Sequence, residues 1–348
     1  MERRSFMVNS AVAATALAAG LGSRQPAAWA QENPNESPAQ PSAEKVGRPV
    51  NIASIGFRPG EHSLAQIIDL VEGEGRRGAD LIVLPEACRG LDGKNQESLD
   101  GPTVTAMSGL AKKYEAYIVC PIDRKDGSRR FNSVVLLNRV GEVACIYNKI
   151  YPVWTAECLQ EPPIRPGESI CVYQTDFGRV GFAICFDVNW SRLWERMANH
   201  GAELVIWPSA YSAGRSLQAQ AIANNYYIVS ATYTPDCLVF DIDGAELLHE
   251  TNNQGNGTNV TRVMLDLDRC IFHQDQNLPK KLDQLLHEHG EDVVQEKWLP
   301  LEGWFVLKAK RPGVSARELA RQYDLEELGH YINRSRCEID KCRGWEFA

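Results

Sequence analysis

The sequence lacks a long hydrophobic run, an excess of positive charge and the cysteine density of a disulfide-stabilised scaffold. Its 348 residues are 44% hydrophobic and 24% charged, which is ordinary for a soluble globular protein with a sizeable core. This composition excludes a disordered chain, a collagen and a multi-span membrane protein. The formal net charge of −8 provides no basic surface for holding nucleic acid. Ten cysteines in a chain of this length are too few for a disulfide scaffold.

Several functional motifs are also missing. The Gly-Asn-Gly segment at residues 255–257 has no helix start behind it, so it does not form a phosphate-binding loop. None of the seven histidines flanks a cysteine motif of the kind that a Cys–His protease uses. His287 and His289, with Cys337 and Cys342, do not make a convincing set of four zinc ligands. We therefore expect no metal and no cofactor. The sequence does not decide whether Cys337 and Cys342 form a terminal disulfide.

The first thirty residues have the pattern of an export signal. Arg3 and Arg4 precede an Ala-rich run at residues 8–21, which is too short and too weakly hydrophobic to span a membrane stably. The paired arginines resemble the twin-arginine signal with which bacteria export folded proteins. A plain Sec signal and an uncleaved N-terminal anchor are the alternatives. We expect a periplasmic or extracellular protein, with no stable membrane span once the signal is processed.

The rest of the chain divides by composition. Residues 31–48 are rich in Pro, Ser, Glu and Gln, which predicts a flexible linker. Over residues 49–278, short apolar runs alternate with amphipathic helical patterns, and two hairpin signals interrupt them. This alternation predicts a layered α/β domain with a mixed sheet. Residues 279–348 are more polar and predict a C-terminal helical extension, with one helix at 318–331, that packs on the core or on a neighbouring subunit.

Three reactive side chains each follow an apolar run that predicts a buried strand. Glu86 lies in LPEA, Lys149 in NKIYP and Cys185 in GFAICFD. The carboxyl ends of strands are where open α/β sheets place their ligand sites. A thiol at the junction between a strand and a helix, near the positive end of the helix, favours the thiolate. Taken singly, a helix-capping Glu, a surface Lys and a core Cys explain the same residues.

Together the motifs resemble the nitrilase superfamily of carbon–nitrogen hydrolases. LPE at Glu86, NK with a following Pro at Lys149, and ICFD at Cys185 occur in the order that this family shows. A second glutamate, Glu157, follows the lysine as in the amidase branch. The resemblance covers residues 50–268. It implies a four-layer α-β-β-α sandwich with two mixed β-sheets, assembled as a homodimer or a larger homo-oligomer.

The resemblance also implies a mechanism that the residue types support. Cys185 attacks an amide or nitrile carbon and holds the acyl group as a thioester. Glu86 is the general base that takes the thiol proton and later activates water. Lys149 stabilises the oxyanion, together with the backbone N–H of Phe186. Glu157 is expected to orient the substrate or the water molecule.

Residues around the cysteine motif bear on the substrate. Val188 and Asn189 occupy the positions where branches that bind an N-carbamoyl amino acid place arginines, so a neutral or amine-bearing amide is favoured. Trp154, Phe186 and Tyr211, with Asn189, are predicted to bind the substrate, although aromatic residues in such positions are often part of the core. A nitrilase, an N-carbamoyl amine hydrolase and a catalytically silent binding protein of the same fold are the alternatives.

The export signal makes a prediction about the mature chain. A small-residue cleavage site, Ala-Trp-Ala at residues 28–30, predicts that processing leaves Gln31 as the first residue. Intact-mass analysis of the mature protein is expected to give the mass of residues 31–348. A mass that includes Met1 would contradict cleavage and favour the N-terminal anchor.

Overall fold

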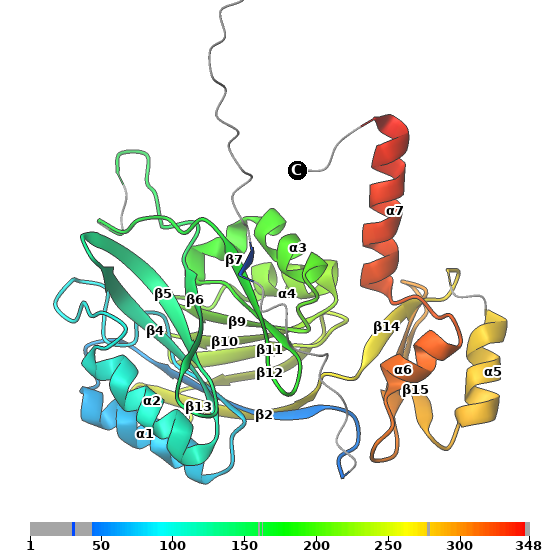
Figure 1. Ribbon diagram of the computed structural model, residues 1–348, viewed down its shortest axis with the longest axis horizontal. Helices are drawn as coiled ribbons and strands as arrows, with labels where there is room; N and C mark the ends of the chain where they lie inside the picture. Colours follow the sequence, from blue (N-terminus) through cyan, green and yellow to red (C-terminus); the bar gives the residue numbers. More distant parts are fainter. Residues whose placement is uncertain (1–29, 32–43, 159–160, 162, 277–278, 345–348) are drawn as a thin grey trace, which may run out of the picture.

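The computed structural model describes residues 30–31, 44–158, 161, 163–276 and 279–344, which form a large and a small unit (Figure 1). The predicted export signal and most of the predicted linker lie outside the described residues. Within the described part of the chain, no helix is both long enough and apolar enough to cross a membrane. The large unit contains two β-sheets, and the small unit contains a third.

The first sheet of the large unit has six strands, and two helices cover one of its faces. Its strands are β2 (Pro49–Phe57), β3 (Leu81–Val83), β4 (Tyr117–Asp126), β5 (Arg129–Leu137), β6 (Val143–Asn148) and β13 (Thr258–Asp266), in the order β13-β2-β3-β4-β5-β6. Strands β2, β3 and β4 are parallel because α1 (Leu64–Arg76) and α2 (Pro102–Tyr114) return the chain between them. Strands β4, β5 and β6 form consecutive antiparallel pairs.

The second sheet contains the strand that leads into the predicted nucleophile. Its strands are β1 (Ala30–Gln31), β7 (Ile170–Gln174), β8 (Arg179–Phe182), β9 (Leu204–Ser209), β10 (Tyr227–Thr232), β11 (Asp236–Phe240) and β12 (Glu246–Thr251), in that order across the sheet. The parallel strands β8, β9 and β10 are joined through α3 (Ser191–Asn199) and α4 (Gly214–Asn224). A short 3₁₀ helix, η1 (Cys185–Asn189), separates β8 from α3.

Alternation along the strands places the two sheets face to face. In β2, Val50 and Ile52 belong to the central cluster between the sheets, whereas Ala53 and Ile55 pack with α1 and α2. A third cluster joins the second sheet to α3 and α4. Ser54 Oγ donates to the carbonyl oxygen of Ser230 over 2.6 Å and links the sheets directly. The four-layer α-β-β-α sandwich predicted from the sequence is therefore confirmed.

The C-terminal unit is a mixed α/β structure and not the helical extension that the sequence predicted. Its elements are β14 (Cys270–His273), α5 (Pro279–His289), β15 (Val293–Leu299), β16 (Trp304–Ala309), α6 (Ala316–Gln322) and α7 (Leu328–Arg343), with sheet order β14-β16-β15. Stacked rings of Phe272 and Phe305, with centroids 5.1 Å apart, lie in its own core. The unit begins at β14, at Cys270, so the start predicted at residue 279 is nine residues too late.

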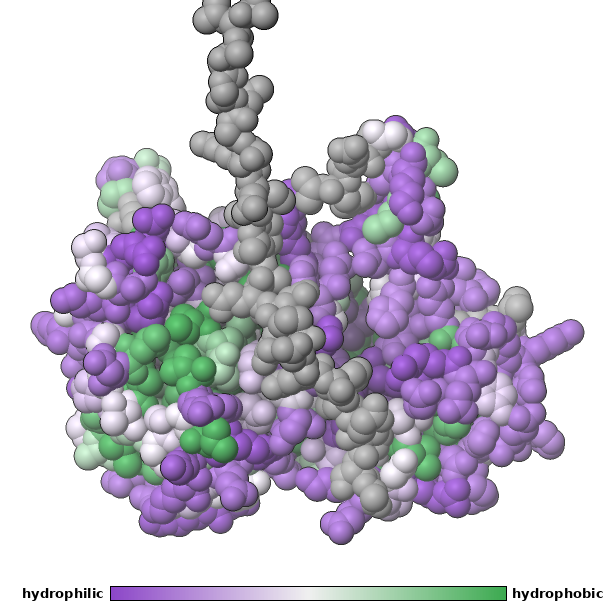
Figure 2. Space-filling model, in the orientation of Figure 1, coloured by the Kyte–Doolittle hydropathy of each residue, from purple (hydrophilic) through white to green (hydrophobic). Residues whose placement is uncertain are grey.

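Two local predictions in this unit are also corrected. The single helix predicted at 318–331 is two helices, because Asp324 adopts φ of +53° in the left-handed region and ends the first of them. Cys337 and Cys342 both lie on α7 as free thiols. On the face shown in Figure 2, the C-terminal unit presents mainly hydrophilic side chains.

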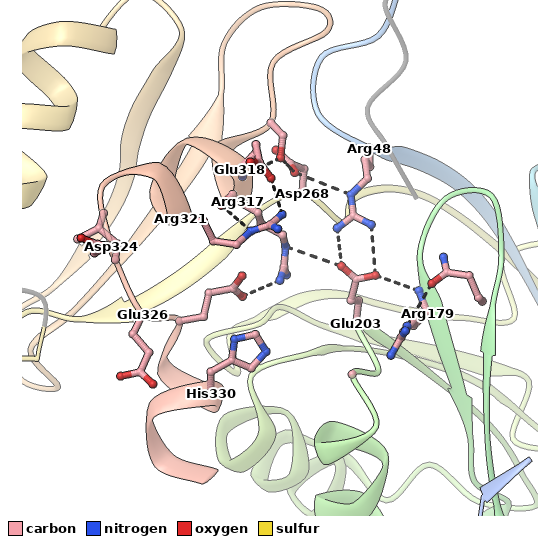
Figure 3. Close-up of a pocket in the computed structure, with 15 residues that line it drawn as sticks. Arg48, Arg179, Glu203, Asp268, Arg317, Glu318, Arg321, Asp324, Glu326 and His330 are labelled. Atoms are coloured by element: carbon pink, nitrogen blue, oxygen red, sulfur yellow. Dashed lines mark hydrogen bonds and ion pairs between the residues drawn. The ribbon is translucent and has the colours of Figure 1, made fainter. Parts of the chain in front are cut away.

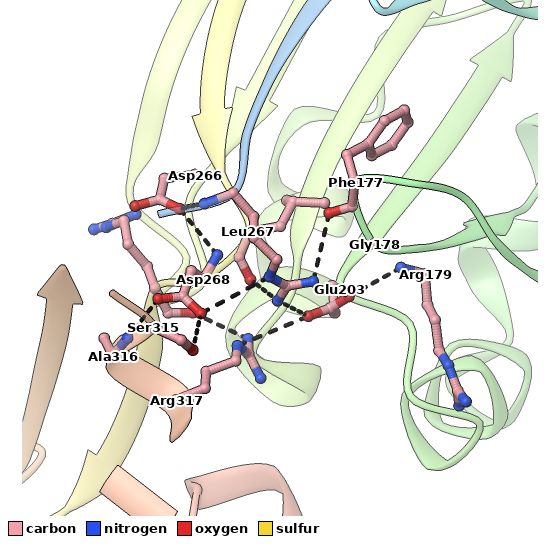
Figure 4. Close-up of polar contacts among 12 residues, drawn as sticks. Phe177, Gly178, Arg179, Glu203, Asp266, Leu267, Asp268, Ser315, Ala316 and Arg317 are labelled. Atoms are coloured by element: carbon pink, nitrogen blue, oxygen red, sulfur yellow. Dashed lines mark hydrogen bonds and ion pairs between the residues drawn. The ribbon is translucent and has the colours of Figure 1, made fainter. Parts of the chain in front are cut away.

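An ion-pair network joins the two units (Figure 4). Arg48 Nη1 donates to Glu203 Oε2 over 3.2 Å, and Arg317 Nε of α6 lies 3.7 Å from Glu203 Oε1. Arg317 also donates to Glu327 over 2.6 Å. Asp268 accepts hydrogen bonds from the hydroxyl group of Ser315 and from the first backbone N–H of α6. Although burial opposes its charge, Arg48 and Arg317 hold the pKa of Glu203 below its ordinary value.

A cleft of about 600 Å³ lies beside this network, between the two units (Figure 3). Its lining is dominated by arginine and carboxylate side chains from both units, with His330 of α7 at one side. Most of these charges already pair with one another, so complementary charges hold this side of the junction. Apolar contacts add to them, because Ile271, Val306 and Leu328 of the C-terminal unit belong to the central cluster of the sandwich.

The network predicts that Glu203 is important for stability. Glu203→Gln leaves Arg48 and Arg317 facing each other without the carboxylate between them, so we expect the free energy of unfolding to fall by about 3 kcal/mol. Glu318→Gln is the control, because its exposed pair with Arg321 contributes less than about 1 kcal/mol. Urea unfolding of the two variants measures the difference. Equal losses in both would contradict this role of Glu203.

Candidate active site

Glu86 is held in a bend at the end of β3. The next residue, Ala87, has φ of +36°, so the chain turns sharply and directs the carboxylate into the molecule, where Glu86 is 2% exposed. Its Oε1 accepts hydrogen bonds from Nδ2 of Asn132 at 2.7 Å and from Nζ of Lys149 at 3.0 Å. One oxygen of this buried carboxylate is thus fixed by two donors from the neighbouring strand β5 and the end of β6.

Lys149 follows β6 and has no exposed side-chain surface. Its Nζ lies 3.0 Å from Glu86 Oε1 and 2.6 Å from Glu161 Oε1. Burial alone would favour the neutral amine, but the charges of Glu86 and Glu161 hold the pKa of Lys149 above its ordinary value. The site therefore contains a permanent positive charge that is shielded from water.

Cys185 begins η1 immediately after the extended segment that continues β8. Its φ of +47° lies in the left-handed region, which is uncommon for a residue other than glycine. The indole N–H of buried Trp207 donates to the carbonyl oxygen of Cys185 over 3.0 Å and holds this conformation. Cys185 is 5% exposed. The nucleophile predicted from the sequence thus lies on a tight turn, as expected for a strand-to-helix junction.

The protonation state of the thiol differs from the prediction. Burial, together with the nearby charge of Glu86, raises the pKa of Cys185 to about 12. The ammonium of Lys149, the backbone N–H of Ala210 and the hydroxyl group of Ser209 lower this pKa only in part. The expected thiolate is therefore not favoured, because η1 is a single short turn whose dipole does not outweigh burial. The thiol needs a base to become reactive.

Asp187 connects the turn that carries Cys185 to the segment that carries Lys149. Its Oδ2 accepts from the backbone N–H of Ile184 at 2.8 Å and from the hydroxyl group of Tyr147 at 2.6 Å. Its Oδ1 accepts from the backbone N–H of Tyr151 at 2.9 Å. Burial raises the pKa of Asp187 to about 6, although these hydrogen bonds favour its charged form. One buried carboxylate thus holds three segments from the two sheets in a fixed relation.

The structure does not bring Glu157 to this cluster. Glu157 is exposed on the loop after β6, where Thr155 and Cys158 pair through their backbones and turn the chain outward. The carboxylate that contacts Lys149 belongs to Glu161, whose Oε2 also accepts from the backbone N–H of Val153 at 3.1 Å. Because both glutamates lie in one loop without a periodic pattern, the sequence did not distinguish the buried one from the exposed one.

The predicted substrate-binding residues separate into two groups. Tyr211 lies near Cys185, and its ring packs edge-on against Trp207 with centroids 5.6 Å apart. Asn189 donates to the carbonyl oxygen of Phe186 over 3.0 Å, within the turn that Cys185 begins. Trp154, in contrast, is 68% exposed on the loop after β6. Phe186 and Asn189 therefore lie on the nucleophile turn and Tyr211 lies close to Cys185, whereas Trp154 is a surface residue.

The sequence analysis missed two residues near the reactive groups. Asn132 donates to Glu86, as described above. Tyr233 follows β10, and its backbone N–H donates to the carbonyl oxygen of Ser209 over 3.1 Å. Burial raises the pKa of the Tyr233 phenol, and the nearby charge of Glu86 raises it further. Neither residue lies in a motif, and only the order of strands in the two sheets, which places β5 after β4 and β10 after β9, brings them to the site.

Comparison with known sequences identifies the family. The sequence model of the carbon–nitrogen hydrolase family matches residues 52–269, which is more than half of the chain. The chain belongs to the carbon–nitrogen hydrolase family. The match ends at Arg269, immediately before β14, so in this carbon–nitrogen hydrolase the C-terminal unit lies outside the matched region. Among the residues that the structure describes, no group of three or more His, Cys, Asp or Glu side chains is arranged to hold a metal ion.

Curated relatives of this carbon–nitrogen hydrolase include a fusion protein and several amidases. The nitrilase and fragile histidine triad fusion protein NitFhit of Drosophila melanogaster is 30% identical over 190 residues, which are 49% of this chain and 41% of that protein. The omega-amidase NIT2 of Danio rerio is 23% identical over 192 residues, 50% of this chain and 69% of the relative. The match thus spans less than half the length of NitFhit.

Solved structures share the fold of this hydrolase. Nit3 of Saccharomyces cerevisiae, a member of branch 10 of the nitrilase superfamily, superposes with a TM-score of 0.54 and 20% identity, covering 65% of this chain and 93% of Nit3. An amidase from Nesterenkonia AN1 gives a TM-score of 0.54 and 19% identity, covering 64% of this chain and 92% of the amidase. Both similarities concern the four-layer sandwich.

The geometry predicts different effects for the two glutamates of the loop in this hydrolase. Glu161→Gln removes a charged acceptor from the buried ammonium of Lys149, so we expect the turnover of short amides to fall about 10- to 100-fold. The matched control Glu157→Gln changes an exposed side chain and is expected to keep turnover within about twofold. Steady-state ammonia release measures both. A larger loss in the control would reassign the role to Glu157.

Proposed function

We propose that the protein hydrolyses a small carboxamide to a carboxylic acid and ammonia or an amine, through a thioester on Cys185. The observation that carries this proposal is the convergence of a buried thiol, a buried carboxylate and a buried ammonium at neighbouring strand ends. Cys185, Glu86 and Lys149 interact there within a site that also contains Glu161. Membership of the carbon–nitrogen hydrolase family and the amidase relatives support the same chemistry.

The first step needs a base, because the pKa of the thiol is raised to about 12. Glu86 is suited to accept the proton. Its Oε1 is occupied by Asn132 and Lys149, whereas its buried Oε2 has no hydrogen-bond partner among the described residues. Proton transfer to this oxygen leaves a thiolate that forms a bond with the amide carbon, and the carbonyl electron pair moves to the oxygen.

The tetrahedral intermediate carries a negative charge on the former carbonyl oxygen. The fixed ammonium of Lys149, together with the backbone N–H of Phe186, stabilises this charge in a site from which water is largely excluded. When the carbon–nitrogen bond breaks, protonated Glu86 gives its proton to the leaving nitrogen. The products of this half-reaction are the thioester and free ammonia or amine.

The second half-reaction releases the acid. Glu86, again a carboxylate, takes a proton from a water molecule as the water attacks the thioester carbon. Collapse of the second tetrahedral intermediate breaks the carbon–sulfur bond, and the proton on Glu86 returns to the sulfur. The thiol and the carboxylate are thus restored, and water is the only other reactant.

Several features favour a small substrate without a carboxylate near the thiol. Glu86 and Glu161 are both within the site, so a further negative charge would be repelled. Phe186 and Tyr211 provide aromatic surface beside Cys185. The Nesterenkonia AN1 amidase has been solved in complex with butyramide and with acrylamide added to its active-site cysteine. Short aliphatic amides are therefore suitable first probes for this protein.

The proposal predicts that Cys185 is both alkylated and required for turnover. We expect iodoacetamide to label the wild type at Cys185 and to stop ammonia release from a short amide. Cys185→Ser should lose one label, by intact mass, and all turnover. The control Cys158→Ser removes an exposed thiol and is expected to lose one label while retaining turnover.

The substrate panel includes short amides, nitriles and N-carbamoyl amines. Ammonia release from amides supports the proposal. Conversion of nitriles alone would indicate a nitrilase instead of an amidase. Conversion of N-carbamoyl amines alone would indicate an N-carbamoyl amine hydrolase. A labelled Cys185 with no turnover of any member of the panel would contradict hydrolysis and favour a binding protein.

A further inference from the structure

Asn132 contacts both the carboxylate and the backbone of the lysine. Its side chain has no exposed surface, and its Nδ2 donates to Oε1 of Glu86 over 2.7 Å. Its carbonyl oxygen accepts from the backbone N–H of Lys149 at 2.9 Å. Asn132 of strand β5 therefore holds the segment of the proposed cation, Lys149, through its backbone and the proposed base, Glu86, through its side chain.

The amide of Asn132 has one acceptable orientation. Rotating it would bring its carbonyl oxygen against the carboxylate of Glu86, so that two acceptors would face each other. In the orientation observed, Oδ1 of Asn132 is buried and has no hydrogen-bond partner among the described residues. Leaving a buried acceptor unpaired costs free energy. A residue that served packing alone would not be expected to carry this cost, which indicates a functional role.

The charges around Glu86 explain why a second donor is useful. The titratable groups that face it are the thiol of Cys185, the phenols of Tyr211 and Tyr233, and the ammonium of Lys149. Lys149 is the one cation of this set, and it also donates to Glu161. Because the positive charge is shared between two carboxylates, the N–H of Asn132 supplies a neutral donor that serves Glu86 alone.

We propose that Asn132 is a positioning residue for the hydrolysis. Its amide holds Oε1 of Glu86 so that Oε2 stays available to the thiol and to water. This inference rests on the function proposed above, because it assigns the orientation of the base in that reaction. It also makes a separate prediction for the reactivity of Cys185 in the absence of substrate.

The test compares Asn132→Leu and Asn132→Asp with the wild type. Asn132→Leu removes the donor at similar volume, and we expect kcat to fall about 10- to 100-fold while KM stays within about threefold. Asn132→Asp preserves the shape but places a second carboxylate against Glu86, so we expect its kcat to fall at least as far.

The matched control is Asn259→Leu. Asn259 is also fully buried on a strand of the first sheet, where it donates to Thr261 over 2.9 Å. This variant is expected to lose stability and to retain the kcat and the pH profile of the wild type. A purely structural role for Asn132 would make the Asn132 and Asn259 variants behave alike.

The rate of Cys185 alkylation by iodoacetamide, followed against pH, separates this inference from the proposed function. We expect slower alkylation in both Asn132 variants, because the base that takes the thiol proton is no longer held in place. If the wild type hydrolyses no member of the panel, the proposed function fails, and the alkylation profiles still test the position of Glu86. Unchanged kcat and unchanged alkylation profiles in a folded variant would overturn the inference. Should Asn132→Leu not fold, the near-isosteric Asn132→Asp provides both measurements.

Discussion

The buried ammonium of Lys149 is the constraint on which the rest of the site depends. An ammonium without exposed surface is stable only when carboxylates compensate for its lost hydration. Glu86 and Glu161 meet this need from two directions, one from the end of β3 and one from the loop after β6. The same arrangement supports the proposed chemistry, because it concentrates a fixed cation and a carboxylate beside the thiol in a site that is shielded from water.

The four-layer sandwich explains how three short strand ends form this arrangement. Glu86 and Lys149 belong to the first sheet and Cys185 to the second, so neither sheet contains the site alone. Asp187 spans the gap by accepting hydrogen bonds from both sides. The left-handed conformation of Cys185 is unfavourable for a residue other than glycine. Buried hydrogen bonds of Asp187 and Trp207 hold the turn in this conformation.

The C-terminal unit is attached by both apolar and charged contacts. It has a core of its own and also contributes Ile271, Val306 and Leu328 to the central cluster of the sandwich. Its junction contains charged groups such as Arg48, Glu203 and Arg317. The charged part of this interface requires one relative position of the two units, because each buried charge must lie next to a group of opposite charge. The family match ends where this unit begins, which agrees with a distinct element added to a conserved type of fold.

Local sequence patterns were sufficient to predict much of the fold of the sandwich. Period-two runs and amphipathic stripes predicted the strands and helices of the sandwich, since each strand or helix buries one defined face. The motifs at Glu86, Lys149 and Cys185 predicted the reactive groups, because each follows directly on a buried strand. Those inferences depend on residues that are close together in the chain.

Tertiary structure decided what depends on contacts between distant residues. Glu161 rather than Glu157 meets Lys149 because of the path of a loop that has no periodic pattern. Asn132 joins the site because β5 pairs with β4 and β6, and no feature of its own segment marks it. The protonated state of Cys185 follows from burial and from the charge of Glu86, which local sequence does not contain. Sequence by itself determined which groups the proposed reaction uses. Packing determined which partners hold them and in which protonation state, because desolvation and charge pairing arise only when separate segments meet.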